Sequence, residues 1–274
     1  MNILEKIVAE RRKAVNKLKQ IIPVQAWEMM PMFDKKCPSL KENLLNEGLT
    51  GIIAEFKRSS PSKGIINDKV RVDEVVIDYE LNGASGISIL TEPLFFDGNN
   101  DDIYDIAQSL TTPILRKDFI IDEYQILESK AIGGDVILLI AACLTKKQVK
   151  QFALLAKEIG MEVILEIHDE KELDHICDET ELVGINNRNL KTFEVDIERS
   201  LKMAKMIPAD KIKIAESGID SVENILLFKE HGFKGFLIGE LFMKQADPGK
   251  AFAEFISELT LLEKRKAQTR NKNE

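Results

Sequence analysis

Short apolar, β-branched segments recur along most of the chain, and this repetition limits the possible folds more than any other feature. Eight such segments are present, at residues 51–56, 84–90, 112–116, 135–140, 161–167, 182–186, 211–216 and 235–239. Their Val, Ile and Leu runs are typical of strands buried on both faces. The stretches between them place apolar residues at helical spacing, and those at 146–160 and 221–233 carry glycine near the far end, a common helix C-cap. The sequence therefore predicts a strand–helix unit repeated eight times.

Strands that alternate with helices form a parallel sheet, and eight units in about 200 residues suit a closed (β/α)8 TIM barrel. The alternative is an open doubly wound sheet. The glycine fingerprint G-x-G-x-x-G that usually follows the first strand of such a sheet is missing. We therefore expect one α/β domain over residues 1–274, built as a (β/α)8 barrel.

Two segments flank the predicted barrel. Residues 1–48 form an N-terminal helical extension, because the segment 3–19 repeats apolar residues at helical intervals and Pro23 stops that helix or follows it. Two placements remain open for this helix: a plug at the barrel bottom or a lid near the mouth. Residues 262–274 form a polar C-terminal tail, in which the basic run Lys264, Arg265 and Lys266 predicts solvated disorder.

The charge balance excludes several classes of partner. The net charge is -8 and no basic stripe is present, which argues against binding to nucleic acid or to an anionic membrane surface. The longest apolar run, residues 136–144, is far shorter than the roughly 20 residues needed to cross a bilayer. No export signal opens the sequence, so we expect a cytoplasmic protein. Its oligomeric state stays open between a monomer and a weak homodimer.

Three residues that can bind metals lie close together in the sequence. They are His168, His175 and Cys177. Their spacing matches no standard zinc pattern, so we expect no metal site. The three cysteines of the chain are odd in number and widely spaced, which argues against a disulfide framework.

Polar side chains follow five of the predicted strands, at the ends that form the mouth of a TIM barrel. They are Glu55, Lys57, Lys117, Glu166, Asn186, Arg188, Glu216 and Ser217. Residues two apart on a strand point the same way, so Glu55 with Lys57, and the pair at positions 186 and 188, are expected to project together. One polar strand end taken alone is usually a terminus that meets solvent. Cations and carboxylates that converge on one mouth suit acid–base catalysis.

Two glycine-containing turns follow the last two strands. These are ESGI at 216–219 and IGE at 238–240. Glycine lets backbone N–H groups approach an anion closely, and TIM barrels often bind phosphate at these two loops. The sequence therefore predicts a phosphate site there, provided that the carboxylate of Glu240 turns away from the ligand.

Eight motifs, taken in order, resemble the indole-3-glycerol phosphate synthases of tryptophan biosynthesis. They are IAEFKRSSPSKG, LTEPLFFDG, ILRKDFIID, DVILLIA, EVILEIHD, GINNRNL, AESGI and LIGELFM, and they span nearly the whole chain. The resemblance implies ring closure of 1-(2-carboxyphenylamino)-1-deoxyribulose 5-phosphate to indole-3-glycerol phosphate, with loss of carbon dioxide and water. It implies no cofactor and no metal.

The resemblance also implies residue roles. Lys117 is expected to protonate the sugar carbonyl as a general acid, and Glu166 to stabilise charge or accept a proton. Glu55 and Lys57 are expected to serve the later dehydration and the substrate carboxylate, although the division of proton transfers among these four residues stays open. The other implied positions are Asn186, Arg188, Glu216 and Ser217 for orientation, and Ser60, Gly218, Gly239 and the N–H of Glu240 for the phosphate. Phe96, Phe119, Leu138 and Leu190 occupy positions suited to an apolar slot for the aromatic ring, with core packing an equal alternative for Leu138.

Two other functions stay open at this point. The phosphate loops alone also fit another phosphosugar barrel enzyme, such as phosphoribosylanthranilate isomerase. A barrel that binds a metabolite or partner without catalysis is a third reading, since a fold does not imply a function. The presence of both acids and bases at positions 55, 57, 117 and 166 favours the synthase.

Overall fold

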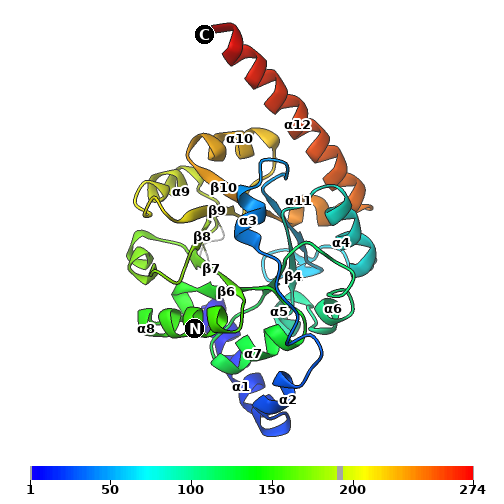
Figure 1. Cartoon of the computed structure of the whole chain (residues 1–274), viewed down its shortest axis with the longest axis vertical. Coiled ribbons are helices and arrows are strands. Elements are labelled where there is room, and N and C mark those ends of the chain that lie inside the picture. The colour runs from blue at the N-terminus through cyan, green and yellow to red at the C-terminus, as the bar shows by residue number, and fades with distance from the viewer. Residues whose placement is uncertain (1, 190–193, 274) are drawn as a thin grey trace.

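The structure is a computed structural model that describes residues 2–189 and 194–273, and within these residues eight parallel strands close into a barrel (Figure 1). The barrel strands are β1 (Ile52–Phe56), β4 (Gly86–Leu90), β5 (Ile114–Lys117), β6 (Val136–Ile140), β7 (Glu162–Ile167), β8 (Leu182–Asn186), β9 (Ile212–Glu216) and β10 (Phe233–Ile238). Each strand pairs with the next along the chain, and β10 pairs with β1 to close the ring. The predicted TIM barrel and its eight strands are confirmed.

Helices alternate with the strands and surround the ring (Figure 1). Their bounds are α4 (Val72–Leu81), α5 (Pro93–Phe96), α6 (Asp101–Tyr104), α7 (Glu123–Ala131), α8 (Lys146–Glu158), α9 (Ile197–Ala204), α10 (Val222–Glu230) and α11 (Glu240–Met243), with 3-10 turns η1 (Ala141–Cys143) and η2 (Glu170–His175). The two helices expected at 146–160 and 221–233 are α8 and α10. Thr145 and Ser221 cap their first turns by accepting backbone N–H groups, which explains where each helix begins.

Apolar side chains pack in two layers. One cluster fills the space between the strands and the surrounding helices, and a second fills the barrel interior with side chains such as Leu115, Leu138 and Ile164. Burial of a side chain of this size contributes about 1.5–3 kcal/mol. The two layers hold the strands on both faces and therefore fix the positions of the strand ends.

The short helix α3 (Leu40–Leu45) closes the bottom of the barrel and lies across the ring of strands in Figure 1. Leu40 and Leu44 are buried in the interior cluster. Gly86, at the start of β4, leaves room for this helix, since a Cβ there would lie 2.7 Å from Cδ1 of Leu40. Glu162, at the start of β7, accepts hydrogen bonds from Ser39 Oγ (2.5 Å) and from the N–H of residue 41 (3.0 Å).

The longer N-terminal helix α1 (Ile3–Ile21) lies at the opposite end, at the mouth, and α2 (Val24–Glu28) follows it. Ile3, Leu4 and Ile7 line the cavity in the mouth. Of the two placements that the sequence left open, the one near the mouth is therefore observed for α1, while α3 acts as the plug.

A hairpin follows β1 that the sequence analysis did not predict. Strands β2 (Ser59–Ser60) and β3 (Gly64–Ile65) pair antiparallel within the loop of Ser, Pro, Lys and Gly. Gly64 has φ +67°, a left-handed conformation that glycine adopts without steric cost. The hairpin brings Ser60 and Ser62 to the cavity.

The C-terminal tail is helical over residues 262–273, which corrects the expectation of disorder there. Helix α12 (Pro248–Asn273) begins against α4 and α11 and projects away from the barrel in Figure 1. Ion pairs tie its middle part to α10: Lys229 Nζ lies 2.6 Å from Glu263 Oε1, and Lys266 Nζ lies 3.0 Å from Glu230 Oε1. Lys266, one of the three basic residues that suggested solvation, thus has a partner on a neighbouring helix, and Lys and Arg are themselves good helix formers. No helix in the described part of the chain is long and apolar enough to cross a membrane.

Candidate active site

A cavity of about 420 Å³ opens at the carboxyl ends of the barrel strands. Its lining includes the candidate residues Glu55, Lys57, Ser60, Phe96, Lys117, Phe119, Leu138, Glu166, Asn186, Arg188, Glu216, Ser217, Gly218, Gly239 and Glu240. Leu190, the remaining candidate, lies outside the described residues. Residues from six strands and the hairpin therefore converge on one site.

Lys117 lies at the centre of the charged group. Its Nζ is 3.0 Å from Glu166 Oε2 and 3.5 Å from Glu216 Oε2. Asn186 Nδ2 donates to the other oxygen of Glu166, Oε1, at 3.2 Å. The two glutamates are almost fully buried, and the ammonium is mostly buried between them. One ammonium and two carboxyl groups therefore share a space with little water, where charge interactions are strong.

A glycine on β8 makes this arrangement possible. Strand β8 runs between β7, which carries Glu166, and β9, which carries Glu216. A Cβ at Gly184 would lie 2.1 Å from Glu216 Oε1. The missing side chain therefore provides the space that the carboxyl group of Glu216 occupies.

The three charged groups shift one another's pKa values. Burial disfavours the charge on Lys117, but Glu166, Glu216 and Glu55 outweigh it and raise the pKa of Lys117. Burial also disfavours the Glu166 carboxylate, yet Lys117 and His168 hold the pKa of Glu166 well below its usual value. For Glu216, burial and the charge of Glu166 raise the pKa to about 8. The site at neutral pH thus holds an ammonium, a carboxylate and a mainly protonated carboxyl group, a combination suited to proton transfer.

A second charged pair lies on β1 and just beyond it. Lys57 Nζ is 2.5 Å from Glu55 Oε1, so the two side chains project together as expected from their spacing. Gly239, after β10, packs directly on the side chain of Glu55, because a Cβ there would lie 2.5 Å from Glu55 Oε1. The turn after β10 therefore fixes the position of Glu55.

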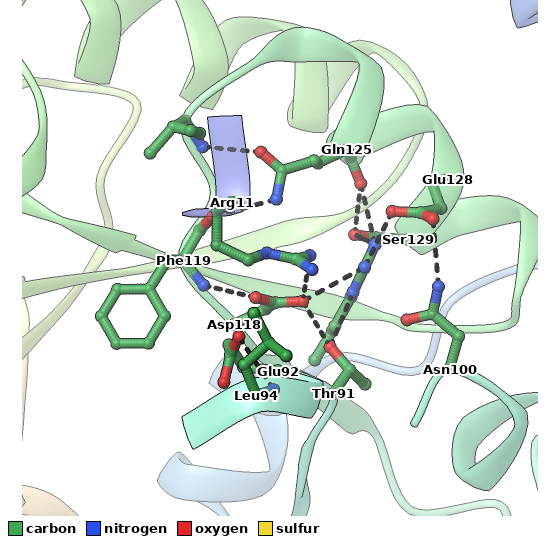
Figure 2. A network of polar contacts seen from close by, with 12 residues as sticks. Arg11, Thr91, Glu92, Leu94, Asn100, Asp118, Phe119, Gln125, Glu128 and Ser129 are labelled. Atoms are coloured by element: carbon green, nitrogen blue, oxygen red, sulfur yellow. Dashed lines mark hydrogen bonds and ion pairs between the residues drawn. The ribbon is translucent and has the colours of Figure 1, made fainter. Parts of the chain in front are cut away.

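The residue after Lys117 anchors the site to the barrel wall (Figure 2). Asp118 Oδ2 accepts from Arg11 Nη2 at 2.7 Å, from Thr91 Oγ1 at 2.7 Å and from Arg116 Nη2 at 3.3 Å, and Oδ1 accepts the N–H of Phe119 at 2.7 Å. The carboxylate is buried, so these donors replace the water that it would otherwise need. Asp118 therefore fixes the backbone that presents Lys117 and Phe119.

The guanidinium of Arg116 extends this network toward α7. It is completely buried, lies 2.8 Å from Glu128 Oε2 and donates to Ser129 Oγ at 3.0 Å. A buried charge of this kind is tolerated only when it is paired and hydrogen-bonded. The network thus links the strand of Lys117 to a surrounding helix.

Aromatic side chains form one wall of the cavity. Phe96 and Phe119 face each other with ring centroids 6.0 Å apart and planes tilted by 38°. Glu92 caps α5 by accepting the N–H groups of Leu94 and Phe95, which sets the position of Phe96. Leu138 both lines the cavity and belongs to the interior cluster, so its position is compatible with both roles considered for it.

The turn after β9 has an unusual backbone. Ser217 and Gly218 have φ of 66° and 68°, so two successive residues are left-handed. A Cβ at Gly218 would lie 2.3 Å from Cγ1 of Val195, which excludes larger residues. Ser217 and Gly218 both line the cavity, so this turn forms part of its wall.

The carboxylate of Glu240 engages two cations at the mouth. Its oxygens lie 3.3 Å from Lys63 Nζ and 3.6 Å from Arg188 Nη2. Arg188 Nη1 also donates to Ser62 Oγ of the hairpin at 3.0 Å. These contacts join the hairpin to the loops after β8 and β10.

The three residues considered as metal ligands in the sequence, at positions 168, 175 and 177, do not face one common point. His168 lies beside Glu166, the ring of His175 contacts the carbonyl oxygens of Glu172 and Leu144, and the N–H of Cys177 bonds to a threonine hydroxyl. Among residues 2–189 and 194–273, no group of three or more His, Cys, Asp or Glu side chains is arranged to hold a metal ion.

Sequence reasoning missed several residues of the site. The helical spacing of apolar residues identified the apolar face of α1, but it did not show which part of the barrel that face covers. Asp118 sits inside the motif ILRKDFIID, next to the candidate acid, and could have been found there. Gly184 gave no signal, because a glycine in a strand does not reveal which side chain fills its space.

Comparisons with known proteins agree with one another. A family model described as indole-3-glycerol phosphate synthase matches residues 4–255. The indole-3-glycerol phosphate synthase of Bacteroides thetaiotaomicron is 43% identical over 255 residues, which cover 93% of this chain and 98% of that protein. The enzyme of the same name from Caldanaerobacter subterraneus subsp. tengcongensis is 44% identical over 261 residues, covering 94% and 98%. A chain of the tryptophan synthase a2b2 complex from Pyrococcus furiosus shares the fold alone, with a TM-score of 0.56 and 17% identity over 76% of this chain and 97% of that chain.

Proposed function

The chain belongs to the indole-3-glycerol phosphate synthase family, and from this premise we propose how its residues divide the work of the reaction. The protein is a carboxy-lyase of tryptophan biosynthesis that converts 1-(2-carboxyphenylamino)-1-deoxyribulose 5-phosphate to indole-3-glycerol phosphate. Of the functions that the sequence left open, this is the one that the relatives share.

Ring closure needs an acid at the sugar carbonyl, and Lys117 is our candidate. The observation that carries this assignment is the ammonium held 3.0 Å from Glu166 inside a mostly buried mouth. As the aromatic carbon attacks the carbonyl carbon, Lys117 gives its proton to the carbonyl oxygen, which becomes a hydroxyl group. Glu166 stabilises the positive charge that develops near it, or accepts a proton. General acid–base groups of this kind contribute about 10²–10⁴-fold to rate.

Decarboxylation and dehydration follow ring closure. The carbon–carboxylate bond breaks and its electrons restore the aromatic ring, so carbon dioxide leaves. The slot of Phe96, Phe119 and Leu138 surrounds the aromatic ring and removes water from its carboxylate, which favours this departure. Glu55 and Lys57 then serve the dehydration: one of them gives a proton to the hydroxyl group, which leaves as water, and the other accepts the proton lost from the neighbouring carbon as the double bond of the indole forms. The structure supports this pairing because the two groups lie 2.5 Å apart in the same cavity.

Orientation and phosphate binding fall to the remaining residues. Asn186 and Glu216 hold the acid–base groups by their contacts with Glu166 and Lys117, while Arg188 and Ser217 orient the sugar. The phosphate binds at Ser60 and at the backbone of Gly218, Gly239 and Glu240. Because the Glu240 carboxylate engages Lys63 and Arg188, its N–H can face the phosphate without the side chain opposing it.

The scheme uses only side chains and backbone groups, and it needs no cofactor or metal. The ligand in this scheme is a small phosphosugar. We propose that the protein acts in the cytoplasm and that it has no nucleic acid or membrane partner. Both a monomer and a weak homodimer are compatible with it, since the cavity is lined within one chain.

Absorbance and fluorescence of the indole product test the scheme directly. Wild-type protein and the Lys117→Ala variant are mixed with the carboxyphenylamino substrate, with chelator and without added metal. Product from the wild type and at least ~100-fold slower product from the variant would support the acid assignment. A variant as fast as the wild type would overturn it.

A further inference from the structure

A buried histidine lies beside the carboxylate of Glu166, and the scheme above does not use it. His168 follows β7 directly and is only 8% exposed. Its Nε2 lies 3.0 Å from Glu166 Oε1. Within the described chain His168 is not one of the residues that line the cavity, so it reaches Glu166 from outside the space that substrate occupies.

A second carboxylate holds this histidine from its other side. Glu172, on η2, accepts the backbone N–H of His168 at 2.6 Å, and the same oxygen lies 3.4 Å from ring Nδ1. The ring is thus placed between two carboxylates. Each ring nitrogen therefore faces one carboxylate at ion-pair distance, 3.0 Å for Nε2 and 3.4 Å for Nδ1.

The surroundings keep the ring charged at neutral pH. Burial disfavours the imidazolium, but Glu166 and Glu172 outweigh it and raise the pKa of His168 to about 9. The other titratable groups nearby are Cys143 on η1, whose thiol pKa is raised to about 12 by burial and the same carboxylates, and Lys117 and Glu216 beyond Glu166.

The two oxygens of Glu166 have different partners. Oε2 faces Lys117 at 3.0 Å, whereas Oε1 faces His168 at 3.0 Å and Asn186 at 3.2 Å. A carboxylate with one oxygen held in this way cannot rotate without losing two contacts. We propose that His168, held by Glu172, is a positioning residue for Glu166 that fixes Oε1 and so keeps Oε2 on Lys117.

This inference rests on the proposed role of Glu166 in the reaction. It also differs from a structural role for His168, in which the imidazole would only hold η2 against the barrel. A structural role predicts a lower unfolding free energy with an unchanged kcat per folded molecule. A positioning role predicts a lower kcat with little change in KM, because the substrate does not touch His168.

The first experiment measures kcat and KM for His168→Gln, Glu172→Gln and Glu166→Gln, with His175→Gln as the matched control. His175 lies on the same η2 segment but contacts only backbone carbonyl groups. We expect kcat to fall about tenfold in His168→Gln, below the ~10²-fold or greater effect of removing an acid or base itself. Glu172→Gln, which leaves His168 and Glu166 in place, should lower kcat about threefold, since the ring loses one of its two partners. The control should keep wild-type kcat.

The second experiment observes the imidazole directly by 15N NMR of histidine-labelled protein. The chain has three histidines, so His168 is assigned from the spectrum of His168→Gln. We expect its pKa to be about 9 in the wild type, and closer to the free value in Glu172→Gln.

The outcomes separate this inference from the function on which it rests. A Glu166→Gln variant with wild-type kcat would overturn the role of Glu166 and this inference with it. An inactive Glu166→Gln variant beside a His168→Gln variant of wild-type kcat would overturn the inference alone. A His168 pKa at or below the free value would also overturn it, whereas the expected kcat loss together with the raised pKa would support it.

Discussion

Arg11 and Asp118 are 107 residues apart in the sequence and meet in a buried ion pair of 2.7 Å at the mouth of the barrel. The contact joins α1 to the residue that follows the candidate acid Lys117 (Figure 2). The N-terminal helix is therefore part of the frame that holds the active site.

Replacing Arg11 by Met should release α1 from this frame. We expect a loss of about 1–3 kcal/mol in unfolding free energy, less than for an isolated buried pair, because Asp118 keeps Thr91, Arg116 and a backbone N–H as donors. KM should rise, since α1 lines the cavity. Denaturant unfolding and steady-state kinetics check both effects. Lys13→Met is the control, because Lys13 pairs with Glu10 on an exposed face of the same helix; equal effects of the two variants would contradict the prediction.

Rate should depend on the protonation of Glu216. As pH rises through about 8, this carboxyl ionises beside Lys117 and makes the ammonium a weaker acid. We therefore expect kcat/KM to fall between about pH 7 and about pH 8.5, and this limb to be absent in Glu216→Gln. The same shift affects folding: the stability contributed by this group is complete below its unfolded pKa and is lost as pH rises through about 8. A limb that persists in Glu216→Gln would assign the titration to another group.

A methyl group at Gly239 should disturb catalysis through Glu55. The new Cβ would lie 2.5 Å from Glu55 Oε1 and would force that side chain from Lys57. We expect kcat of Gly239→Ala to fall at least ~10-fold, with a stability loss of about 1–3 kcal/mol from overpacking. Gly48→Ala, in an exposed loop, is the control. Kinetics and thermal unfolding measure the two effects, and an unchanged kcat would show that Glu55 can move without consequence.

Removal of residues 264–274 should leave activity intact. Among the side chains that the structure describes, the deletion removes the exposed ion pair between Lys266 and Glu230, and it leaves the packing of Gly249 and Phe252 on α4 in place. Exposed pairs contribute about 0–1 kcal/mol, so the unfolding free energy should change by no more than that. Calorimetry of the truncated and complete chains, with kinetics of both, is the measurement. A loss of activity would mean that the end of α12 reaches the mouth.

The barrel was predictable because its signal is local. Each strand is a short apolar run, and each polar residue at a strand end is adjacent to it in the sequence, so the convergence of Glu55, Lys117, Glu166 and Glu216 follows once the ring is closed. Side chains two positions apart on a strand, such as those at 55 and 57, point to the same side because side chains alternate between the two faces of a strand.

The features that were not predicted depend on contacts between distant segments. The helical period of α1 identifies an apolar face but not the surface that it covers, so plug and lid could not be separated. The tail seemed solvated because its charges were read without Lys229 and Glu230, which lie more than thirty positions earlier. His168 was considered only as a metal ligand, since its two carboxylate partners could not be placed from spacing alone.

The plug formed by α3 has a consequence for turnover. With the bottom of the barrel filled by Leu40 and Leu44, substrate and products exchange through the mouth. Indole-3-glycerol phosphate that has not yet departed therefore occupies the route of the next substrate, and the enzyme should show product inhibition competitive with substrate. By closing one end of the barrel, α3 thereby requires product to leave through the mouth before the next substrate can bind.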